Sequence, residues 1–168
     1  MKLILPDPVY LDSYREAVKE NKDNNVKESC FANPDQPDLF EKFRNNRLGI
    51  NLQPGWVKQT SYWLIDNEQF IGEIGIRHEL NDFLINYGGH IGYGIRHSKW
   101  GQGYGTKMLT LALKEAKKMG LKRVLITCDD DNYGSAKVIE NNGGVLENIV
   151  ENNIYGEIIH TKRYWIDL

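Results

Sequence analysis

A glycine-rich turn in the middle of the chain is the strongest chemical signal in the sequence. The run 100–105 reads Trp-Gly-Gln-Gly-Tyr-Gly and separates a β-rich segment from a helical one. Glycine adopts left-handed backbone conformations and lets a ligand approach the backbone closely. Backbone N–H groups at the start of the following helix then converge, which suits a phosphate group. The turn therefore predicts a phosphate-containing ligand, and the alternative is a tight strand–helix corner that serves packing alone.

Two familiar phosphate-binding patterns do not fit this turn. A P-loop requires a glycine directly before its lysine, but Lys107 follows Thr106. The dinucleotide fingerprint is Gly-x-Gly-x-x-Gly with an acidic residue about 20 positions later. Here the spacing is Gly-x-Gly-x-Gly and position 125 is Leu125. The phosphate ligand is therefore of another kind.

Titratable side chains lie on the segments that lead to this turn. His90 precedes Gly92 and Gly94 at strand spacing, so these three residues share one face where bare backbone leaves room for a ligand. An ordinary histidine is largely neutral at pH 7 and can accept a proton. His90 is the first candidate for a general base, and the alternative is a histidine that fills space beside glycines. The preceding segment carries the rival candidates Glu73 and His78 and the weaker candidate Glu79.

Metal and thiol chemistry are not expected. The run 129–140 places Asp129, Asp131 and Glu140 at calcium-loop positions, but Tyr133 occupies a ligand position and a strand precedes the run. The aspartates suit the start of a helix better. Cys128 ends an apolar segment and resembles a small buried residue, and no cysteine–histidine set has zinc spacing.

The elements that must position these residues form a mixed α/β pattern. Helical spacing of apolar residues predicts helices at 9–21 and 36–47, and a hairpin follows at 60–66 and 69–78 with Asn67-Glu68 as its turn. A strand at 90–96 leads into the glycine turn. The remaining expected elements are a helix at 106–119, a strand at 123–128, a helix at 134–142 and strands at 145–151 and 157–167. We expect one domain over residues 1–168 with the order α-α-β-β-β-α-β-α-β-β.

Two motifs in the segment 90–144 resemble the GCN5-related N-acetyltransferase (GNAT) superfamily, in the branch similar to ribosomal-protein and antibiotic acetyltransferases. The family loop is Arg/Gln-x-x-Gly-x-Gly/Ala, and Gly103 and Gly105 match it, whereas Trp100 stands where Arg or Gln is usual. The family then shows Asn-x-x-Ser/Ala before a helix, matched by Asn132 and Ser135. Trp100 leaves the backbone cradle intact and removes one polar contact.

The resemblance implies a fold and a cosubstrate. The fold is a single GNAT domain whose mixed central sheet splays at an acetyl-CoA cleft and is flanked by helices. Residues 1–89 would form the acceptor-side half, 90–144 the acetyl-CoA core and 145–168 the last strands. The backbone of Ile95 and Arg96 would bind the pantetheine arm. The resemblance places pyrophosphate contacts at Gln102, Gly103, Tyr104, Gly105 and Thr106, and pantetheine contacts at Asn132 and Ser135. Asn132 is equally suited to capping a helix.

The reaction that the resemblance implies is direct attack of a primary amine on the thioester, with no metal and no protein nucleophile. A lysine-type ammonium needs about 4–5 kcal/mol to become neutral at pH 7. His90 lies where many members carry a glutamate, and Glu73 is the second catalytic candidate. Many members carry a proton-donating tyrosine seven residues after the asparagine, but that position is Ile139. The general acid is therefore unassigned. The competing function is a catalytically idle acyl-CoA-binding sensor.

Composition sets the remaining expectations. The 168 residues carry 21 Lys and Arg against 23 Asp and Glu, so a net charge of −2 disfavours bulk nucleic-acid binding. The chain has two cysteines and lacks an apolar run long enough for a membrane span, which predicts a soluble cytoplasmic protein with free thiols. The partner we expect is an amine acceptor, either a small molecule or a protein N-terminus. The last strand could also pair two copies as a homodimer.

Overall fold

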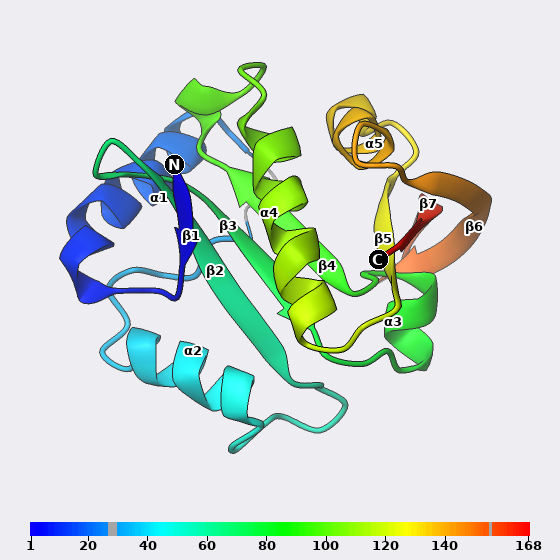
Figure 1. Cartoon of the computed structure of the whole chain (residues 1–168), viewed down its shortest axis with the longest axis horizontal. Coiled ribbons are helices and arrows are strands. Elements are labelled where there is room, and N and C mark those ends of the chain that lie inside the picture. Colours follow the sequence, from blue (N-terminus) through cyan, green and yellow to red (C-terminus); the bar gives the residue numbers. More distant parts are fainter. Residues whose placement is uncertain (27–29, 155) are drawn as a thin grey trace.

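One seven-stranded mixed sheet organises the protein (Figure 1). The computed structural model describes residues 1–26, 30–154 and 156–168. The strand order is β1-β2-β3-β4-β5-β7-β6. The strands are β1 (Lys2–Ile4), β2 (Gln59–Asp66), β3 (Gln69–Arg77), β4 (Ile91–Ile95), β5 (Arg123–Asp129), β6 (Val145–Ile154) and β7 (Glu157–Asp167). The α-helices are α1 (Leu11–Asp23), α2 (Leu39–Leu48), α3 (Asp82–Asn86), α4 (Tyr104–Lys118) and α5 (Tyr133–Glu140).

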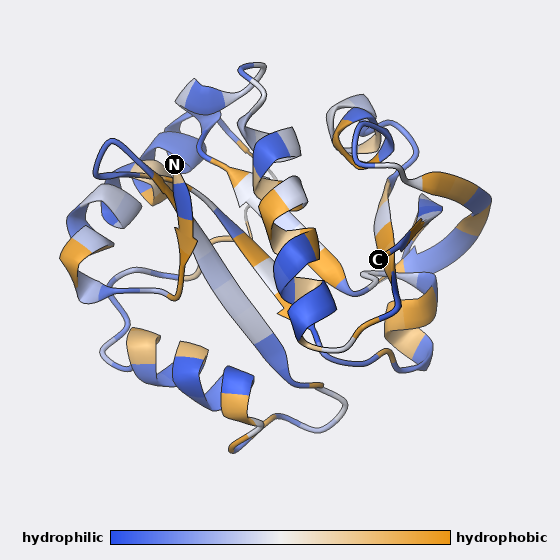
Figure 2. Cartoon of the chain, in the orientation of Figure 1, coloured by the Kyte–Doolittle hydropathy of each residue, from blue (hydrophilic) through white to orange (hydrophobic). Residues whose placement is uncertain are grey.

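Each face of the sheet has its own core. Helices α4 and α5 cover one face, where Met108, Leu109 and Ile139 pack against isoleucines of β3 and β4. Helices α1 and α2 cover the other face, where Tyr14 and Leu39 pack against aromatic residues of β2 and β3. Figure 2 shows hydrophobic and hydrophilic residues alternating along α4, as expected for a helix with one buried stripe. The two cores confirm the mixed sheet flanked by helices.

The junction between β4 and β5 is the irregular point of the sheet. Strand β4 pairs with β3 over five antiparallel positions, but it pairs with β5, in parallel, only at Ile91 and Ile126 among the described residues. Strand β5 then pairs with β7 along its whole length, from Arg123 to Asp129. The two central strands therefore diverge beyond Ile91, toward the end at which the glycine turn follows β4. This is the splay that the resemblance implies.

The hairpin turn is where local sequence dictates structure most directly. Asn67 and Glu68 have φ values of 47° and 57°, so both central residues are left-handed. Two-residue hairpin loops favour this geometry because its twist matches that of the strands. The predicted turn is confirmed at the predicted residues.

The predicted element order was incomplete in two places. Strand β1 was missed because Pro6 and Pro8 follow directly and only three residues pair with β2. Helix α3 was missed because it has five residues, too few for a periodic pattern; Asn81 caps it by accepting a hydrogen bond from Leu84 N–H. The α4 helix also begins two residues earlier than predicted, at Tyr104, inside the glycine turn.

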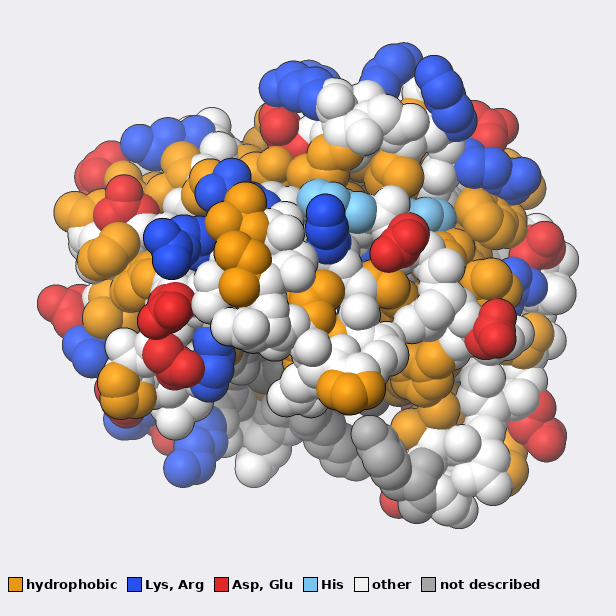
Figure 3. Space-filling model, turned by 90° about the horizontal axis from the view of Figure 1, so that it is seen from below, with side chains coloured by type: hydrophobic (Ala, Val, Ile, Leu, Met, Phe, Trp, Pro, Cys, Tyr) orange, Lys and Arg blue, Asp and Glu red, His pale blue; other side chains and the backbone are white. Residues whose placement is uncertain are grey.

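Two negative findings apply to the described part of the chain. None of its helices has the length and apolar character needed to cross a bilayer. No group of three or more potential metal ligands occurs within it either. Figure 3 shows Lys and Arg interspersed with Asp and Glu on the face seen from below, with histidine side chains among them. That face therefore carries no broad field of one sign.

Candidate active site

The glycine turn combines a backbone cradle with a close packing contact. Gly101 and Gly103 have φ values of 70° and 80°, and a Cβ at either position would meet nothing within 4 Å. These two glycines are therefore required by backbone conformation. At Gly105 a Cβ would lie 3.0 Å from Val138 of α5, so this glycine allows α4 and α5 to approach.

The start of α4 presents free amide donors to this cradle. The bond from Lys107 N–H to the Gly103 carbonyl, at 3.1 Å, closes the first turn of the helix. The amides of residues 104–106 precede that bond and point out of the helix N-terminus, as at any helix start. Their orientation, together with the helix dipole, favours an anion. The structure shows the packing corner at Gly105, and phosphate binding at the helix start stays a prediction.

Residues around the turn hold its backbone in place. Trp100 Nε1 donates to the Ile95 carbonyl at 2.8 Å, and Gln102 Nε2 donates to the Ser98 carbonyl at 2.8 Å. The Ile95 carbonyl, a backbone group predicted to bind the pantetheine arm, thus already accepts a hydrogen bond from Trp100. The Arg96 amide donates to the Ile71 carbonyl at 2.9 Å, so this predicted ligand contact is already engaged within the sheet.

The Arg96 side chain makes a buried anchor beneath the turn. Its Nη2 lies 2.7 Å from Glu20 Oε2 of α1, and Glu20 also accepts a hydrogen bond from Ser98 N–H. These contacts lower the pKa of Glu20 although its partial burial acts in the opposite direction. Helix α1 is therefore tied to the segment that leads into the glycine turn.

The second predicted motif forms the other wall of the splay. Asn132 Oδ1 accepts from Ser135 N–H at 3.0 Å, so Asn132 caps α5. Ser135 Oγ lies 2.9 Å from the hydroxyl of Tyr93 on β4, and the two side chains connect the strands that diverge. Both residues lie beside the splay, and their contact with the pantetheine arm stays a prediction.

Glu73 is a buried carboxyl on the opposite face of the sheet. Trp63 Nε1 donates to its Oε2 at 3.1 Å, and the Tyr14 hydroxyl donates to the same oxygen at 3.4 Å. Burial raises the pKa of Glu73 to about 7, although both hydrogen bonds favour the charged form. Gly94 lies directly across from Glu73 in the β3–β4 register. A carboxyl that titrates near neutrality thus faces the strand next to the splay.

Three glycines lie on the same face of the sheet as Glu73: Gly75, Gly92 and Gly94. Ile74 and Ile76 belong to the α4-side core, so the alternating residues of β3 face away from α4. A Cβ at Gly94 would lie 2.9 Å from Cys30 Sγ, and one at Gly92 would meet Arg77 alone. A Cβ at Gly75 would lie 2.7 Å from Gln59 Nε2, so neighbouring side chains cover the sheet at both Gly75 and Gly94.

His90 is locked in the sheet. Its Nδ1 accepts a hydrogen bond from Leu125 N–H at 2.9 Å, and its own amide donates to the Leu125 carbonyl at 2.7 Å. A neutral ring whose Nδ1 accepts must carry its proton on Nε2. Burial, helped by the charge of Arg77, lowers the pKa of His90 to about 4. The geometry is thus unfavourable for the predicted base, and it fits a histidine that joins β4 to β5 at their closed end.

The rival candidates lie farther from the splay. His78 Nε2 is 2.8 Å from Thr60 Oγ1 at the end of the hairpin, and burial lowers the pKa of His78. Glu79 is exposed beyond it. Neither residue shares a contact with Glu73.

Position 139 contributes no acid. Ile139 is fully buried, and a Cβ at Gly144 would lie 2.4 Å from its side chain. Two nearby groups carry a proton: Tyr133 is 76 % exposed, and burial raises the pKa of the Cys128 thiol to about 11. Cys128 and Cys30 are both free thiols.

Several site residues escaped the sequence reasoning. Tyr14 lies in the predicted helix 9–21 and Trp63 in the predicted strand 60–66, and neither was a candidate site residue, but both hydrogen-bond to Glu73. Arg77 was not singled out. Tyrosine and tryptophan each carry a donor that needs a partner when buried, and that is the one signal that pointed to a buried acceptor near them.

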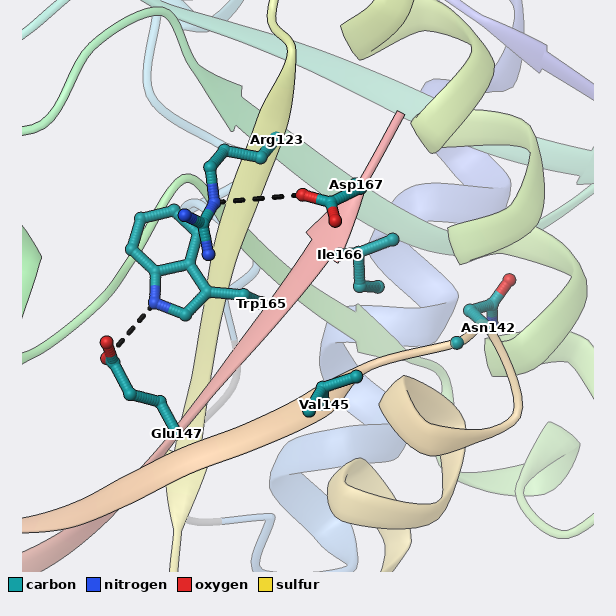
Figure 4. A pocket seen from close by; sticks show the side chains of 8 residues that line it. Arg123, Asn142, Val145, Glu147, Trp165, Ile166 and Asp167 are labelled. Carbon is teal, nitrogen blue, oxygen red and sulfur yellow. Dashed lines mark hydrogen bonds and ion pairs between the residues drawn. The ribbon is translucent and has the colours of Figure 1, made fainter.

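A separate cavity of about 500 Å³ lies at the β6–β7 end of the molecule. Trp165 forms one wall, where it donates to Glu147 Oε2 at 3.0 Å and its ring lies 3.9 Å from the guanidinium of Arg123 (Figure 4). None of the residues that line this cavity belongs to the glycine turn, and Glu73 is not among them.

The chain belongs to the acetyltransferase (GNAT) domain family, whose model matches residues 7–145. No curated protein matches the sequence closely enough to count as a relative.

Solved structures with the same fold cover nearly the whole chain. The microcin C7 self-immunity acetyltransferase, in complex with acetyl-CoA and AMP, is 19 % identical with a TM-score of 0.73, and the match covers 99 % of this chain and 91 % of that one. A Salmonella typhimurium acetyltransferase that modifies the N-terminal serine of a 50S ribosomal subunit protein is 19 % identical, with a TM-score of 0.71 and coverages of 99 % and 94 %. A variant of spermidine N-acetyltransferase from Vibrio cholerae is 18 % identical, with a TM-score of 0.65 and coverages of 99 % and 95 %.

Proposed function

We propose that the protein transfers an acetyl group from acetyl-CoA to a primary amine by direct attack of the amine on the thioester. Glu73 carries this proposal: a carboxyl with a pKa of about 7 lies opposite Gly94, next to the splay that leads to the glycine turn. Membership of the acetyltransferase family supports the reaction type, and the acetyl-CoA complex of a similar structure supports the cosubstrate.

The chain's own groups suit the parts of acetyl-CoA. The amides of residues 102–106 would hold the pyrophosphate, because the helix start and the left-handed glycines direct N–H groups to one point. The splay beside Ile95 would take the pantetheine arm, with Asn132 and Ser135 on its far wall. Acetyl-CoA supplies an activated thioester, so no protein nucleophile is required.

The protein's part in the chemistry is to handle the proton of the amine. An ordinary lysine-type ammonium has a pKa of about 10.4 and must lose its proton before it can attack. Glu73 is positioned for this step because Trp63 and Tyr14 fix its carboxylate from one side. Its pKa of about 7 makes it an effective base near neutral pH. We propose Glu73 over His90 because the Nδ1 lone pair of His90 is already occupied by Leu125 N–H.

Two matched variants test the base assignment. Glu73→Gln should lower kcat by about 10²–10⁴-fold, the usual effect of losing a general base, and leave acetyl-CoA binding within twofold. His90→Gln retains an acceptor for Leu125 N–H and should keep most of the activity. A larger loss in His90→Gln than in Glu73→Gln would overturn the assignment.

An idle acyl-CoA sensor is the second candidate, and Ile139 favours it because the core position holds no hydroxyl. Thermal melting with acetyl-CoA, CoA, ATP and NAD comes first. Ligand at about 100-fold its Kd adds ~2.7 kcal/mol of stability, which is about 2–4 °C for a domain of this size. A shift with acetyl-CoA, followed by thiol release with an amine panel, supports the enzyme. A shift without release from any amine supports the sensor.

The predicted pairing of two copies through the last strand is wrong, because β7 is paired on both sides, with β5 and with β6. A second copy would instead pair at the outer edge of β6, which is the free edge at this end of the sheet.

A further inference from the structure

Tyr93 lies on β4 just beyond the point where the sheet opens. Strands β4 and β5 pair at Ile91 and Ile126, and Tyr93 is two residues further along β4. Because side chains alternate along a strand, Tyr93 points to the same face as Ile91, and its ring packs against the core under α4 and α5. Its hydroxyl lies 2.9 Å from Ser135 Oγ in the first turn of α5. Tyr93 therefore connects the two walls of the splay.

The sheet is open beside Tyr93. Strand β4 lies between β3 and β5, yet Gly92, Tyr93, Gly94 and Ile95 are all partly exposed. In β3, by contrast, every residue of the run 70–76 is buried. The neighbours of β4 on the β3 side are fully paired, so the exposure of β4 comes from the side on which it separates from β5. A narrow ligand can therefore reach Tyr93 along β4.

The position of the glycine turn sets the direction in which acetyl-CoA would lie in this opening. The turn follows β4, so a pyrophosphate at the start of α4 would lie at the open end of the splay. The arm would then run back along β4 from Ile95 toward Ile91, where β4 and β5 pair and the opening ends. Tyr93 lies midway along this path, so its hydroxyl is placed to meet the sulfur end of the arm.

We propose that the Tyr93 hydroxyl donates a hydrogen bond to the sulfur of CoA and stabilises the thiolate as the acetyl group leaves. This inference rests on the proposed function for the binding of acetyl-CoA. Tyr93 is then a catalytic residue, and Ser135 is a positioning residue that orients the hydroxyl. Glu73 lies across from Gly94, the next residue of β4, so Glu73 and Tyr93 are on opposite faces of the sheet. The amine and the leaving sulfur would be handled from these two faces.

The step balances with a hydrogen bond alone. The C–N bond forms, the C–S bond breaks, and its electron pair stays on the sulfur as a thiolate. The amine gives its proton to Glu73, and the thiolate takes one from water when CoA leaves. Burial raises the pKa of Tyr93, so its hydroxyl keeps its proton while it donates. Cys128, on β5 across the splay, is a neutral thiol because burial raises its pKa to about 11.

The Tyr93 proton is available for such a bond. Either hydroxyl of the Tyr93–Ser135 pair can be the donor, and when Ser135 donates, the Tyr93 proton is released. The other acceptor of the Tyr93 hydroxyl is the Ser135 carbonyl, at 3.3 Å, a longer contact that a sulfur atom would replace. Ile139, one turn after Ser135 on α5, has no polar group to offer.

The thiol of bound CoA reports this hydrogen bond without turnover. Donation to the thiolate lowers the pKa of a thiol, so the pKa of the bound CoA thiol should rise by about 1–2 in Tyr93→Phe. Thiolate absorbance during a pH titration measures it, after subtraction of the desulfo-CoA complex to remove the protein's own thiols and phenols. Tyr164→Phe, which removes a buried hydroxyl bonded to Glu140 at 3.0 Å, is the matched control and should leave this pKa unchanged. Equal pKa values in wild type and Tyr93→Phe would overturn the inference.

Single-turnover kinetics distinguish Tyr93 from Ser135. Tyr93→Phe should slow acetyl transfer by about 10–100-fold with the Kd for acetyl-CoA within twofold, because the bond strengthens as charge develops on the sulfur. Ser135→Ala keeps the phenol and should retain most of the rate and of the thiol pKa. A larger effect of Ser135→Ala than of Tyr93→Phe on the thiol pKa would overturn the assignment to Tyr93.

The two measurements also separate this inference from the proposed function. A thiol pKa that depends on Tyr93, without acetyl transfer to any amine, supports the sulfur contact and contradicts the proposed enzyme. Acetyl transfer with a thiol pKa independent of Tyr93 supports the enzyme and overturns the sulfur contact. A wild-type protein that does not bind CoA would contradict both.

Discussion

Trp63 and Glu73 face each other across β2 and β3, and the indole Nε1 donates to the carboxyl Oε2 at 3.1 Å. Tyr14 stacks on the same indole, with ring centroids 4.5 Å apart, and donates to the same oxygen. A rigid aromatic pair therefore holds one carboxyl oxygen of a residue that is 6 % exposed. The environment that raises the pKa of Glu73 is the same one that fixes its orientation.

Removing the indole donor should shift the pH dependence of catalysis. Trp63→Phe keeps an aromatic ring but deletes a hydrogen bond that stabilises the charged carboxylate, so the pKa of Glu73 should rise above about 7. The acidic limb of the kcat/KM profile should move to higher pH. Tyr62→Phe, on the other face of β2, is the control and should leave the profile unchanged. A profile that stays in place in Trp63→Phe would mean that Glu73 does not govern it.

The stability of the protein should report the same titration. The folded pKa of Glu73, about 7, exceeds its ordinary value of 4.5, so the folded state holds a proton that the unfolded state releases. Stability from this group is therefore full below about pH 4.5 and is lost as pH rises toward 7, with a total change of about 3 kcal/mol at 1.36 kcal/mol per pH unit.

Glu73→Gln should abolish that dependence. From pH 4.5 to pH 8 the variant should gain about 3 kcal/mol of unfolding free energy relative to wild type, because the amide does not ionise in this range. Urea denaturation at both pH values measures the difference. Parallel curves for the two proteins would show that Glu73 titrates normally in the folded state.

Gly103 and Gly120 lie at opposite ends of α4. Substituting each in turn distinguishes an effect on ligand binding from the effect of backbone strain. Gly103 and Gly120 have φ values of 80° and 89°, and a Cβ at either would meet nothing within 4 Å. Alanine at each should destabilise the protein by about 1–2 kcal/mol, the cost of a left-handed residue. Gly103→Ala alone should weaken acetyl-CoA binding, by tenfold or more, measured by calorimetry. Equal effects of both variants on binding would remove the turn from the cosubstrate site.

The ion pair beneath the turn should couple α1 to the cosubstrate site. Glu20→Gln leaves the buried Arg96 without its carboxylate, which should cost about 3 kcal/mol of stability. It should also raise the Kd for acetyl-CoA, because the segment before the glycine turn loses its anchor at Ser98. Asp23→Asn breaks the exposed pair with Lys19 on the same helix and should cost less than about 1 kcal/mol. Urea denaturation measures the stability of both variants, and calorimetry measures their Kd for acetyl-CoA. An equal Kd in the two variants would show that the ion pair does not affect cosubstrate binding.

Much of the architecture could be predicted because it depends on local sequence patterns. The Asn67-Glu68 turn, the helical stripes and the glycine spacing at 101–105 depend on residues close in sequence, and each was found where expected. Strand β1 and helix α3 were missed because three and five residues carry no measurable period. Their positions follow from pairing with β2 and from the Asn81 cap.

By itself, the sequence determined that a glycine-rich turn precedes α4 and that a second motif stands at the start of α5. It also identified His90 and Glu73 as the two candidate bases. Only the tertiary structure gives a reason to propose Glu73 over His90 as the base. The proton affinity of a side chain depends on burial and on partners remote in sequence. Tyr14 reaches Glu73 from 59 residues away, and Leu125 occupies the His90 ring from 35 residues away.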